Sequence, residues 1–288
     1  MTAPRRALLM ASGANRGAYY AGFPRELADA GVRFELLAGV SAGGVAAAWI
    51  AAGDPDRLEA SWREASRWRI AVHPFLALGR RRSVDQLIRK ITLRMMAVER
   101  ARTAPEEILL GVARVERWPA LGLPKVTQHV LSSRQARDEE EFGRMLRATA
   151  FVPWMNGCRA AIEIDGERYL DGGLVSRVPI AMVPPDRGLD EIWVSACSPH
   201  GLRELQSQLE SWSRSERLVI VTPSEALPAG RWTMEWSRIA ATMDIGRRDM
   251  ATAIRSAADS SGHVVVGVAG ERLHCLVGQD SGPGGRRV

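Results

Sequence analysis

A serine at position 41 is enclosed by glycines in the pentapeptide Gly39-Val40-Ser41-Ala42-Gly43, after an apolar run and before a run typical of a helix. This Gly-x-Ser-x-Gly pattern is typical of a nucleophilic serine on a tight strand-to-helix turn. Glycine is favoured at positions 39 and 43 because bulkier side chains would collide in such a turn. The amides and the dipole of the following helix favour developing negative charge. The pattern therefore predicts acyl transfer through Ser41.

A loop of small residues, Ser12-Gly13-Ala14-Asn15-Arg16-Gly17, follows an earlier apolar run. Such a loop presents backbone N–H groups that can bind a phosphate or an oxyanion. It lacks the Gly-x-x-x-x-Gly-Lys pattern of nucleotide loops and the Gly-x-Gly-x-x-Gly pattern of dinucleotide sites. Its place ahead of the serine turn suits an oxyanion hole, and an ordinary tight turn is the alternative.

The base that would activate Ser41 is harder to identify. The five histidines stand in no catalytic motif, and only two strands fit before Ser41, too few for the α/β-hydrolase order of Ser, acid and His. A carboxylate acting directly on the serine needs no histidine. The tripeptide Asp171-Gly172-Gly173 ends a predicted hairpin strand and supplies such a carboxylate, although Asp-Gly pairs also occur in ordinary turns.

Composition sets limits on the class of protein. Of 288 residues, 46% are apolar and 25% charged, which excludes collagen-like and globally disordered chains. No apolar run approaches the ~18 residues of a membrane span. Three widely spaced cysteines indicate neither a disulfide framework nor a zinc site. No carboxylate or histidine cluster has the spacing of calcium or zinc ligands, and we expect no metal and no cofactor. The absence of a signal peptide favours the cytoplasm, with peripheral contact at a membrane left open.

The charge of +6 comes almost entirely from arginine. It reflects either codon bias or a basic face for phospholipid headgroups, and no nucleic-acid signature accompanies it.

Strand and helix patterns alternate along the chain, which predicts a mostly parallel sheet with helices on its faces. Pro24 falls inside the first predicted helix, so we expect a kink or a shifted start. The predicted strands are 7–11, 34–40, 108–115, 126–131, 162–164, 168–170, 191–196 and 218–221, and the predicted helices include 16–30, 45–52, a helix opened by Asp54-Pro55, and 86–100.

Three further segments carry specific expectations. The helix at 86–100 is interpreted either as a packed surface helix or as a basic amphipathic lid that touches a membrane. Residues 232–260 are expected to be helical, with an interruption near Gly246. Residues 263–268 and 273–277 could form a final hairpin.

The three motifs, in this order, resemble the patatin-like phospholipase family. The likeness extends to Ala148-Thr-Ala-Phe-Val-Pro153 and Gly173-Leu-Val-Ser-Arg-Val-Pro179. The resemblance implies a three-layer α/β/α sandwich over residues 6–260. Beyond it, the sequence pattern predicts a C-terminal hairpin extension at 261–280 and a disordered tail at 281–288. The resemblance also implies a lipid acyl hydrolase of phospholipase A, lysophospholipase or esterase type.

The family's site residues carry over by position. Ser41 would be the nucleophile, Asp171 the base, and the amides around Gly13, Ala14 and Asn15 the oxyanion hole, with Arg16 shaping that loop. Five glycines would support the turns that carry these groups: Gly17, Gly39, Gly43, Gly172 and Gly173. Three features depart from the family pattern: Ser12-Gly13-Ala14 replaces three glycines, Pro24 replaces a leucine-like residue, and Arg177 replaces a common asparagine. Arg177 would favour the carboxylate form of Asp171 if it points inward, and otherwise faces solvent.

Two other functions stay open. The altered oxyanion loop is compatible with a catalytically weak module that binds lipid or a protein. Acyl transfer to an alcohol or a thiol would use the same dyad, because pocket shape chooses the acceptor. Oligomeric state, headgroup and acyl-chain preference are not determined by these patterns.

Overall fold

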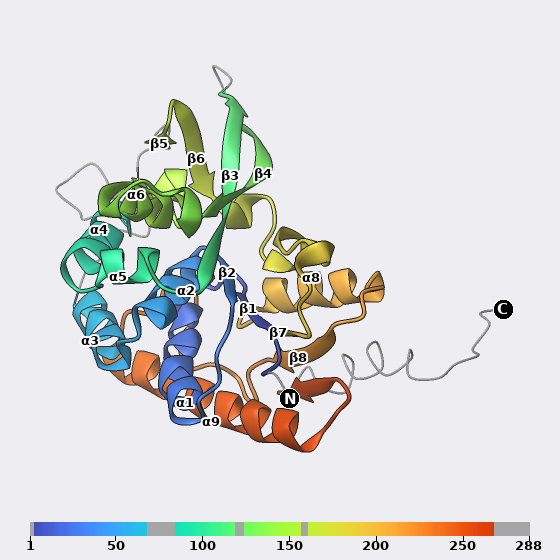
Figure 1. Cartoon of the computed structure of the whole chain (residues 1–288). Helices are drawn as coiled ribbons and strands as arrows, with labels where there is room; N and C mark the ends of the chain where they lie inside the picture. The colour runs from blue at the N-terminus through green and yellow to red at the C-terminus, as the bar shows by residue number, and fades with distance from the viewer. Residues whose placement is uncertain (1–2, 68–83, 119–123, 157–160, 268–288) are drawn as a thin grey trace.

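A single sheet crosses the computed structural model, which describes residues 3–67, 84–118, 124–156 and 161–267 (Figure 1). The strand order is β5-β6-β3-β2-β1-β7-β8-β9, with β4 also paired to β3. The six strands from β3 to β9 along this path run parallel, while β4, β5 and β6 add antiparallel pairs at one end. The strands are β1 Arg6–Met10, β2 Leu36–Val40, β3 Glu107–Arg117, β4 Lys125–Ser132, β5 Ile162–Ile164, β6 Glu167–Asp171, β7 Glu191–Ser195, β8 Arg217–Val221 and β9 Val264–Val266.

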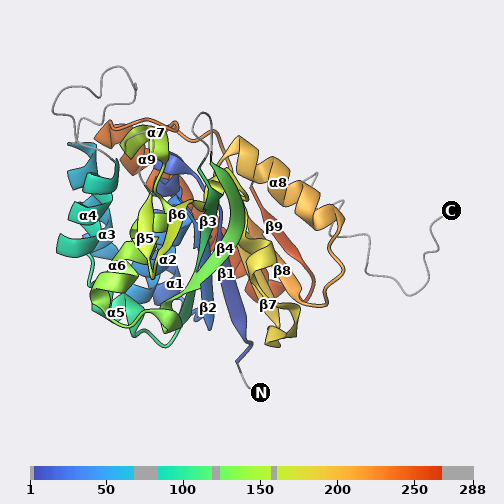
Figure 2. The ribbon, with the colours of Figure 1, turned by 90° about the horizontal axis from the view of Figure 1, so that it is seen from above.

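Helices cover both faces of the sheet, as Figure 2 shows, so the prediction of a three-layer α/β/α sandwich is confirmed. Alternate residues of the buried strands point to opposite faces: Leu8 and Met10 pack in one core, and Leu9 packs in the other. The helices are α1 Phe23–Asp29, α2 Ala42–Ala52, α3 Pro55–Ser66, α4 Val84–Arg94, α5 Val98–Arg102, α6 Glu139–Thr149, α7 Pro153–Asn156, α8 Pro199–Glu210 and α9 Trp236–Asp259.

Strand β3 connects the parallel and antiparallel parts of the sheet. Its first half pairs with β2 in parallel as far as Val40 opposite Gly111. Its next residues pair with β6 in antiparallel orientation, from Asp171 opposite Val112. Both neighbours use the same edge of β3, because β4 occupies the other edge. Strands β2 and β6 therefore end facing each other.

Pro24 shifts the start of the first α-helix. Of the two effects expected of this proline, a kink or a shifted start, the structure shows the second. Residues Ala14–Gly22 form a 3-10 segment, η1, and α1 begins only at Phe23, with Pro24 in its first turn. Proline is tolerated there because the first amides of a helix have no partner within the helix. The predicted Asp54 cap is also confirmed, since its side chain accepts from the Arg57 amide over 3.0 Å.

Two helix predictions were wrong in detail. Residues 86–100 do not form one helix: α4 ends at Arg94 and α5 begins at Val98. The break has a packing cause, because Leu87 packs against Ala65 of α3, whereas Val98 and Ala101 turn into the main core. Helix α9 continues through Gly246 without interruption.

The C-terminal hairpin is only partly open to comparison. Val264–Val266 form β9, which pairs in parallel with β8 as a further strand of the same sheet. The second predicted strand, 273–277, and the tail at 281–288 lie outside the described residues. Helix by helix, no described segment is long and apolar enough to cross a membrane.

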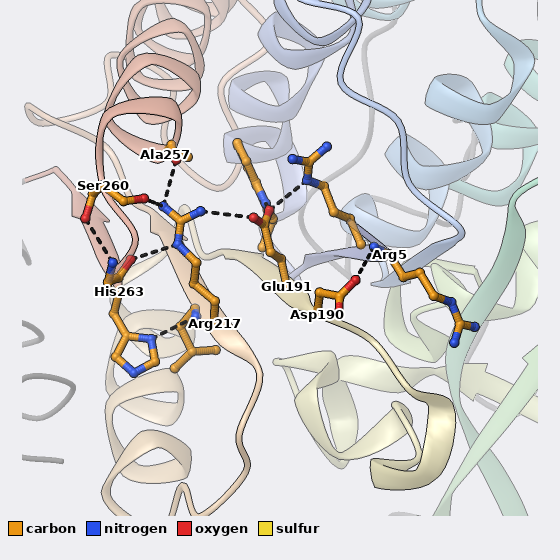
Figure 3. A network of polar contacts seen from close by, with 11 residues as sticks. Arg5, Asp190, Glu191, Arg217, Ala257, Ser260 and His263 are labelled. Carbon is orange, nitrogen blue, oxygen red and sulfur yellow. Dashed lines mark hydrogen bonds and ion pairs between the residues drawn. The ribbon is translucent and has the colours of Figure 1, made fainter. Parts of the chain in front are cut away.

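A polar network fastens α9 to the amino ends of the central strands (Figure 3). The Arg217 guanidinium lies 3.0 Å from Glu191 and donates to the carbonyls of Ala257 and Ser260, over 2.8 and 2.6 Å. These carbonyls end α9, where a cation meets the negative end of the helix dipole. The network lies at the amino ends of these strands, whereas Ser41 follows the carboxyl end of β2.

Candidate active site

Ser41 occupies a strained turn at the carboxyl end of β2. Its φ of 56° and ψ of −123° lie in a region that L-residues other than glycine rarely adopt. Neighbouring glycines make the turn sterically feasible: a Cβ on Gly43 would lie 2.1 Å from the Met10 carbonyl oxygen, and one on Gly39 would lie 2.3 Å from the Gly43 carbonyl. Strain of this kind persists only where surrounding structure enforces it, and it is frequent at functional sites.

The Ser41 hydroxyl points at Asp171. Its Oγ donates to Asp171 Oδ2 over 2.7 Å, at the meeting point of β2 and β6. A short hydrogen bond between a serine and a carboxylate is the geometry in which the carboxylate can accept the hydroxyl proton during attack. The structure thus brings together the two residues for which the sequence suggested a nucleophile and a base.

The Asp171 carboxylate is buried and held at both oxygens. The Gly173 amide donates to Oδ1 over 2.7 Å, and Asp171 itself forms the last residue pair of β6 with β3, opposite Val112. Burial raises the pKa of Asp171 from 3.8 to about 6, and the hydrogen bonds from Ser41 and Gly173 and the charge of Arg177 oppose that rise. At neutral pH the group is therefore mainly a carboxylate, but a more basic one than an exposed aspartate.

Gly172 lets β6 end close against β3. A Cβ on Gly172 would lie 2.3 Å from the Gly111 carbonyl oxygen. Arg177, the unusual residue downstream, is intermediate between the two expectations for it. It ion-pairs with Glu204 over 3.7 Å with its side chain 41% exposed, yet its charge still lowers the pKa of Asp171.

Thr149 supports the serine turn from α6, and sequence reasoning did not identify it. Its Oγ1 accepts from the Ser41 amide over 3.0 Å and donates to the Gly111 carbonyl over 2.7 Å. The side chain therefore ties the turn to the residue of β3 that pairs with Val40. Its segment, 148–153, was part of the family resemblance, but nothing in that segment indicated this role.

The small-residue loop begins the segment η1 beside Ser41. Gly17 allows η1 to approach α2, since a Cβ there would lie 2.6 Å from Ala42 Cβ. Gly13 is pressed against Cys197, whose Sγ lies 2.5 Å from the position of a Cβ at residue 13. Ala14 has a positive φ of 49°, the conformation for which a glycine is the usual choice.

Some backbone amides of this loop donate hydrogen bonds within the protein and others do not. The Asn15 amide donates to the Arg231 carbonyl over 3.3 Å, and the Arg16 amide to the Gly13 carbonyl over 3.2 Å. Within the described part of the chain, the amides of Gly13 and Ala14 donate no hydrogen bond. The Asn15 side chain donates to the Thr233 carbonyl over 2.6 Å, so this residue anchors the segment that precedes α9.

Ser41 and Asp171 open into a cavity of about 340 Å³. Its floor is apolar and comes from α2, α3 and α4, with Trp49, Leu58, Trp62, Leu87 and Ile91. Its rim includes Arg16, Arg177, His200 and Arg231. In the first part of the segment 86–100, Leu87 and Ile91 pack with Ala65 of α3, as the packed interpretation expects. An apolar chamber with a basic entrance suits a molecule with a hydrocarbon tail and a polar or anionic end.

The histidines of the described residues have other partners. His129 stacks on Tyr169, and His263 Nδ1 accepts from the Leu218 amide over 2.9 Å. His200 lies on the cavity rim within 2.6 Å of Arg203. The positive charge of Arg203, then desolvation, and then the charges of Arg177, Arg231 and Arg16 lower the pKa of His200.

Comparisons with known proteins point to one family. The family model described as patatin-like phospholipase matches residues 8–184. Two solved structures are similar: VipD from Legionella pneumophila, at 10% identity and a TM-score of 0.45, covering 88% of this chain and 67% of VipD; and the type III effector protein ExoU, at 13% identity and a TM-score of 0.41, covering 88% of this chain and 53% of ExoU. Among curated proteins, none matches the sequence significantly.

Proposed function

Since the chain belongs to the patatin-like phospholipase family, we propose that it is a serine hydrolase of lipid carboxylic esters, with Ser41 as nucleophile and Asp171 as base. The observation that carries the proposal is the 2.7 Å hydrogen bond from Ser41 Oγ to Asp171 Oδ2 at the mouth of an apolar cavity. The substrate class is a phospholipid or lysophospholipid, whose acyl chain would occupy the cavity floor.

In the first half of the reaction, Asp171 accepts the hydroxyl proton while Ser41 Oγ attacks the ester carbonyl carbon. The free amides of Gly13 and Ala14 are the available donors for the resulting oxyanion, and one such donor typically contributes ~3 kcal/mol to lowering the barrier. The tetrahedral intermediate collapses by breaking the bond to the leaving alcohol. Asp171 returns the proton to that alcohol, and Ser41 carries the acyl group.

In the second half, Asp171 takes a proton from water as the water oxygen attacks the acyl-enzyme. The bond to Ser41 Oγ then breaks, the proton returns to Oγ, and the fatty acid leaves. The raised pKa of Asp171, about 6, suits this role, because a base works best with a pKa near the operating pH.

A fluorophosphonate probe tests the nucleophile directly. We expect the probe to label Ser41, assigned by mass spectrometry, and the label to be absent in Ser41→Ala. Assays of the unlabelled wild type on a panel of lipid esters then define the preferred acyl chain and headgroup. A folded wild type that takes no label at Ser41 would refute the proposal and favour a silent binding module. Transfer of the acyl group to an added alcohol in preference to water would favour the acyltransferase.

A further inference from the structure

Exposed apolar side chains gather at the entrance of the catalytic cavity. Among the described residues, the large hydrophobic side chains classed as exposed are Leu174 at 37%, Val175 at 41% and Trp232 at 44%. Leu174 and Trp232 line the cavity rim, and Val175 follows Leu174 directly. Three such residues at one entrance, with the rest of the described large apolar side chains better covered, indicate a contact surface.

Arginines surround these apolar residues. Arg177 and Arg231 line the cavity together with His200, and the Arg203 guanidinium lies 2.6 Å from His200 Nδ1. Within the described chain, Arg203 and Arg231 form no ion pair with a carboxylate. Glu204, the acid beside Arg177, is engaged by the amides of Arg177 and Val178, over 2.7 and 3.1 Å. The rim therefore presents net positive charge.

Asn15 holds the segment that carries Trp232 in place. Asn15 donates from its amide to the Arg231 carbonyl and from its side chain to the Thr233 carbonyl, over 3.3 and 2.6 Å. Both neighbours of Trp232 are thus tied to the loop beside Ser41, and the ring is displayed outward with the Arg231 guanidinium 5.8 Å from its centroid. In Figure 2 this segment, between β8 and α9, runs along the upper edge of the molecule.

We infer that this rim is a docking surface for a lipid bilayer that carries anionic headgroups. Leu174, Val175 and Trp232 would enter the interfacial layer, where tryptophan is favoured because its ring is apolar and its N–H is polar. Arg203 and Arg231 would contact the headgroup phosphates. In this orientation the entrance of the cavity faces the membrane, so a lipid could pass from the bilayer to Ser41 without crossing water. The orientation argument rests on the proposed function; the surface itself does not.

The docking surface is made of other residues than the segment that sequence reasoning suggested. Residues 86–94 belong to α4, whose Lys90 pairs with Glu64 and whose Leu87 and Ile91 line the same cavity. The exposed apolar residues lie instead on the 3-10 turn after Asp171 and on the segment before α9. These two segments are far apart in the sequence, and the fold brings both to the cavity that contains Ser41.

Vesicle co-sedimentation of the full-length Ser41→Ala protein tests the surface without turnover. We expect binding to vesicles of phosphatidylcholine with 30% phosphatidylglycerol (about 0.3 mole fraction), weak binding to phosphatidylcholine alone, and loss of binding at high salt, since salt screens exposed charges. Adding Arg203→Ala or Arg231→Ala should weaken binding about fivefold each. Arg33→Ala is the matched control, because Arg33 is exposed near the amino end of β2, and it should bind like the parent.

Two measurements address the apolar contacts. Replacing Leu174 and Val175 with serine should weaken binding in both lipid mixtures. Brominated lipids should quench tryptophan fluorescence, and the quenching should fall in Trp232→Phe, a change that keeps an apolar ring. Binding that ignores anionic lipid and salt, or arginine variants that bind like Arg33→Ala, would overturn the proposal and leave a protein partner as the occupant. Such a result would leave fluorophosphonate labelling of the wild type at Ser41 unaffected, so failure of docking and failure of catalysis are distinguishable.

Discussion

Ser41 and Asp171 are joined by a 2.7 Å hydrogen bond across 130 positions of sequence, because β2 and β6 end head to head on one edge of β3. Val40 pairs with Gly111 and Asp171 pairs with Val112. Ser41, the residue that follows β2, therefore points at Asp171, the last residue of β6. Two adjacent residues of a third strand thus set the distance between the hydroxyl and the carboxylate, and the predictions below depend on that arrangement.

The rate of ester cleavage should depend on the ionisation of Asp171. Burial raises the pKa of this carboxyl to about 6, and only the carboxylate accepts the Ser41 proton. We expect kcat/KM on a soluble short-chain ester to be flat above about pH 7 and to fall about tenfold per pH unit well below pH 6. A profile that stays flat down to pH 4 would show that Asp171 is not the base in the free enzyme.

Replacing Asp171 with asparagine should abolish turnover and stabilise the fold at neutral pH. A rise of the pKa from 3.8 to about 6 means that folding disfavours the carboxylate by about 3 kcal/mol. The sign follows: this cost is absent well below pH 3.8, grows as the pH rises from 3.8 to about 6, and is complete above that. Asparagine fits the same space and carries no charge.

The measurement is urea unfolding of the wild type and Asp171→Asn at pH 7 and pH 5. The stability gain should be about 3 kcal/mol at pH 7 and about half of that at pH 5. An equal gain at both values would assign the effect to packing and not to ionisation.

Ser41→Gly should be more stable than Ser41→Ala, although neither should turn over substrate. The backbone at position 41, with φ 56° and ψ −123°, is unfavourable for alanine as for serine and accessible to glycine. We expect a difference of about 1 kcal/mol in the free energy of unfolding, after the greater freedom of unfolded glycine is included. Thermal unfolding of the two variants measures it, and equal stabilities would mean that the turn is not strained.

Ala14→Gly should stabilise the protein by about 0.5–1 kcal/mol, because Ala14 holds a positive φ of 49°. Ala18→Gly is the matched control. Ala18 is fully buried in η1, and glycine there should cost about 1 kcal/mol. Denaturant unfolding of both variants decides the matter, and losses at both positions would contradict the assignment of strain to residue 14.

Gly13 and Cys197 should show strong coupling in a double-mutant cycle. A Cβ at residue 13 would lie 2.5 Å from Cys197 Sγ, so Gly13→Ala alone should cost about 1–3 kcal/mol by overpacking. In a Cys197→Ala background the sulfur is gone, and the same change should cost much less. Additive losses would indicate that the Gly13 backbone, and not the contact with the sulfur, demands glycine.

The sequence alone determined the local features of this protein. Alternating apolar runs and helix patterns predicted the layered sheet, because local propensity and hydrophobic period decide which elements form. The Gly-x-Ser-x-Gly turn, the Asp54 cap and the hairpin turn at Asp165-Gly166, with φ values of 51° and 79°, follow from backbone sterics within a few residues. Motif order indicated the family, which the family model confirmed over residues 8–184.

Tertiary structure decided the relationships across the chain. The Thr149 support of the serine turn, the contact between Gly13 and Cys197, and the engagement of the Asn15 amide by Arg231 each join segments that no local pattern links. The helix breaks between α4 and α5 because Leu87 packs against α3 whereas Val98 packs in the main core. Helix α9 is uninterrupted at Gly246, and the missing side chain there lets η1 approach, since a Cβ would lie 2.0 Å from the Tyr19 carbonyl oxygen. The pKa of Asp171 is likewise a tertiary property, since burial of the carboxylate against β3 requires the assembled sheet.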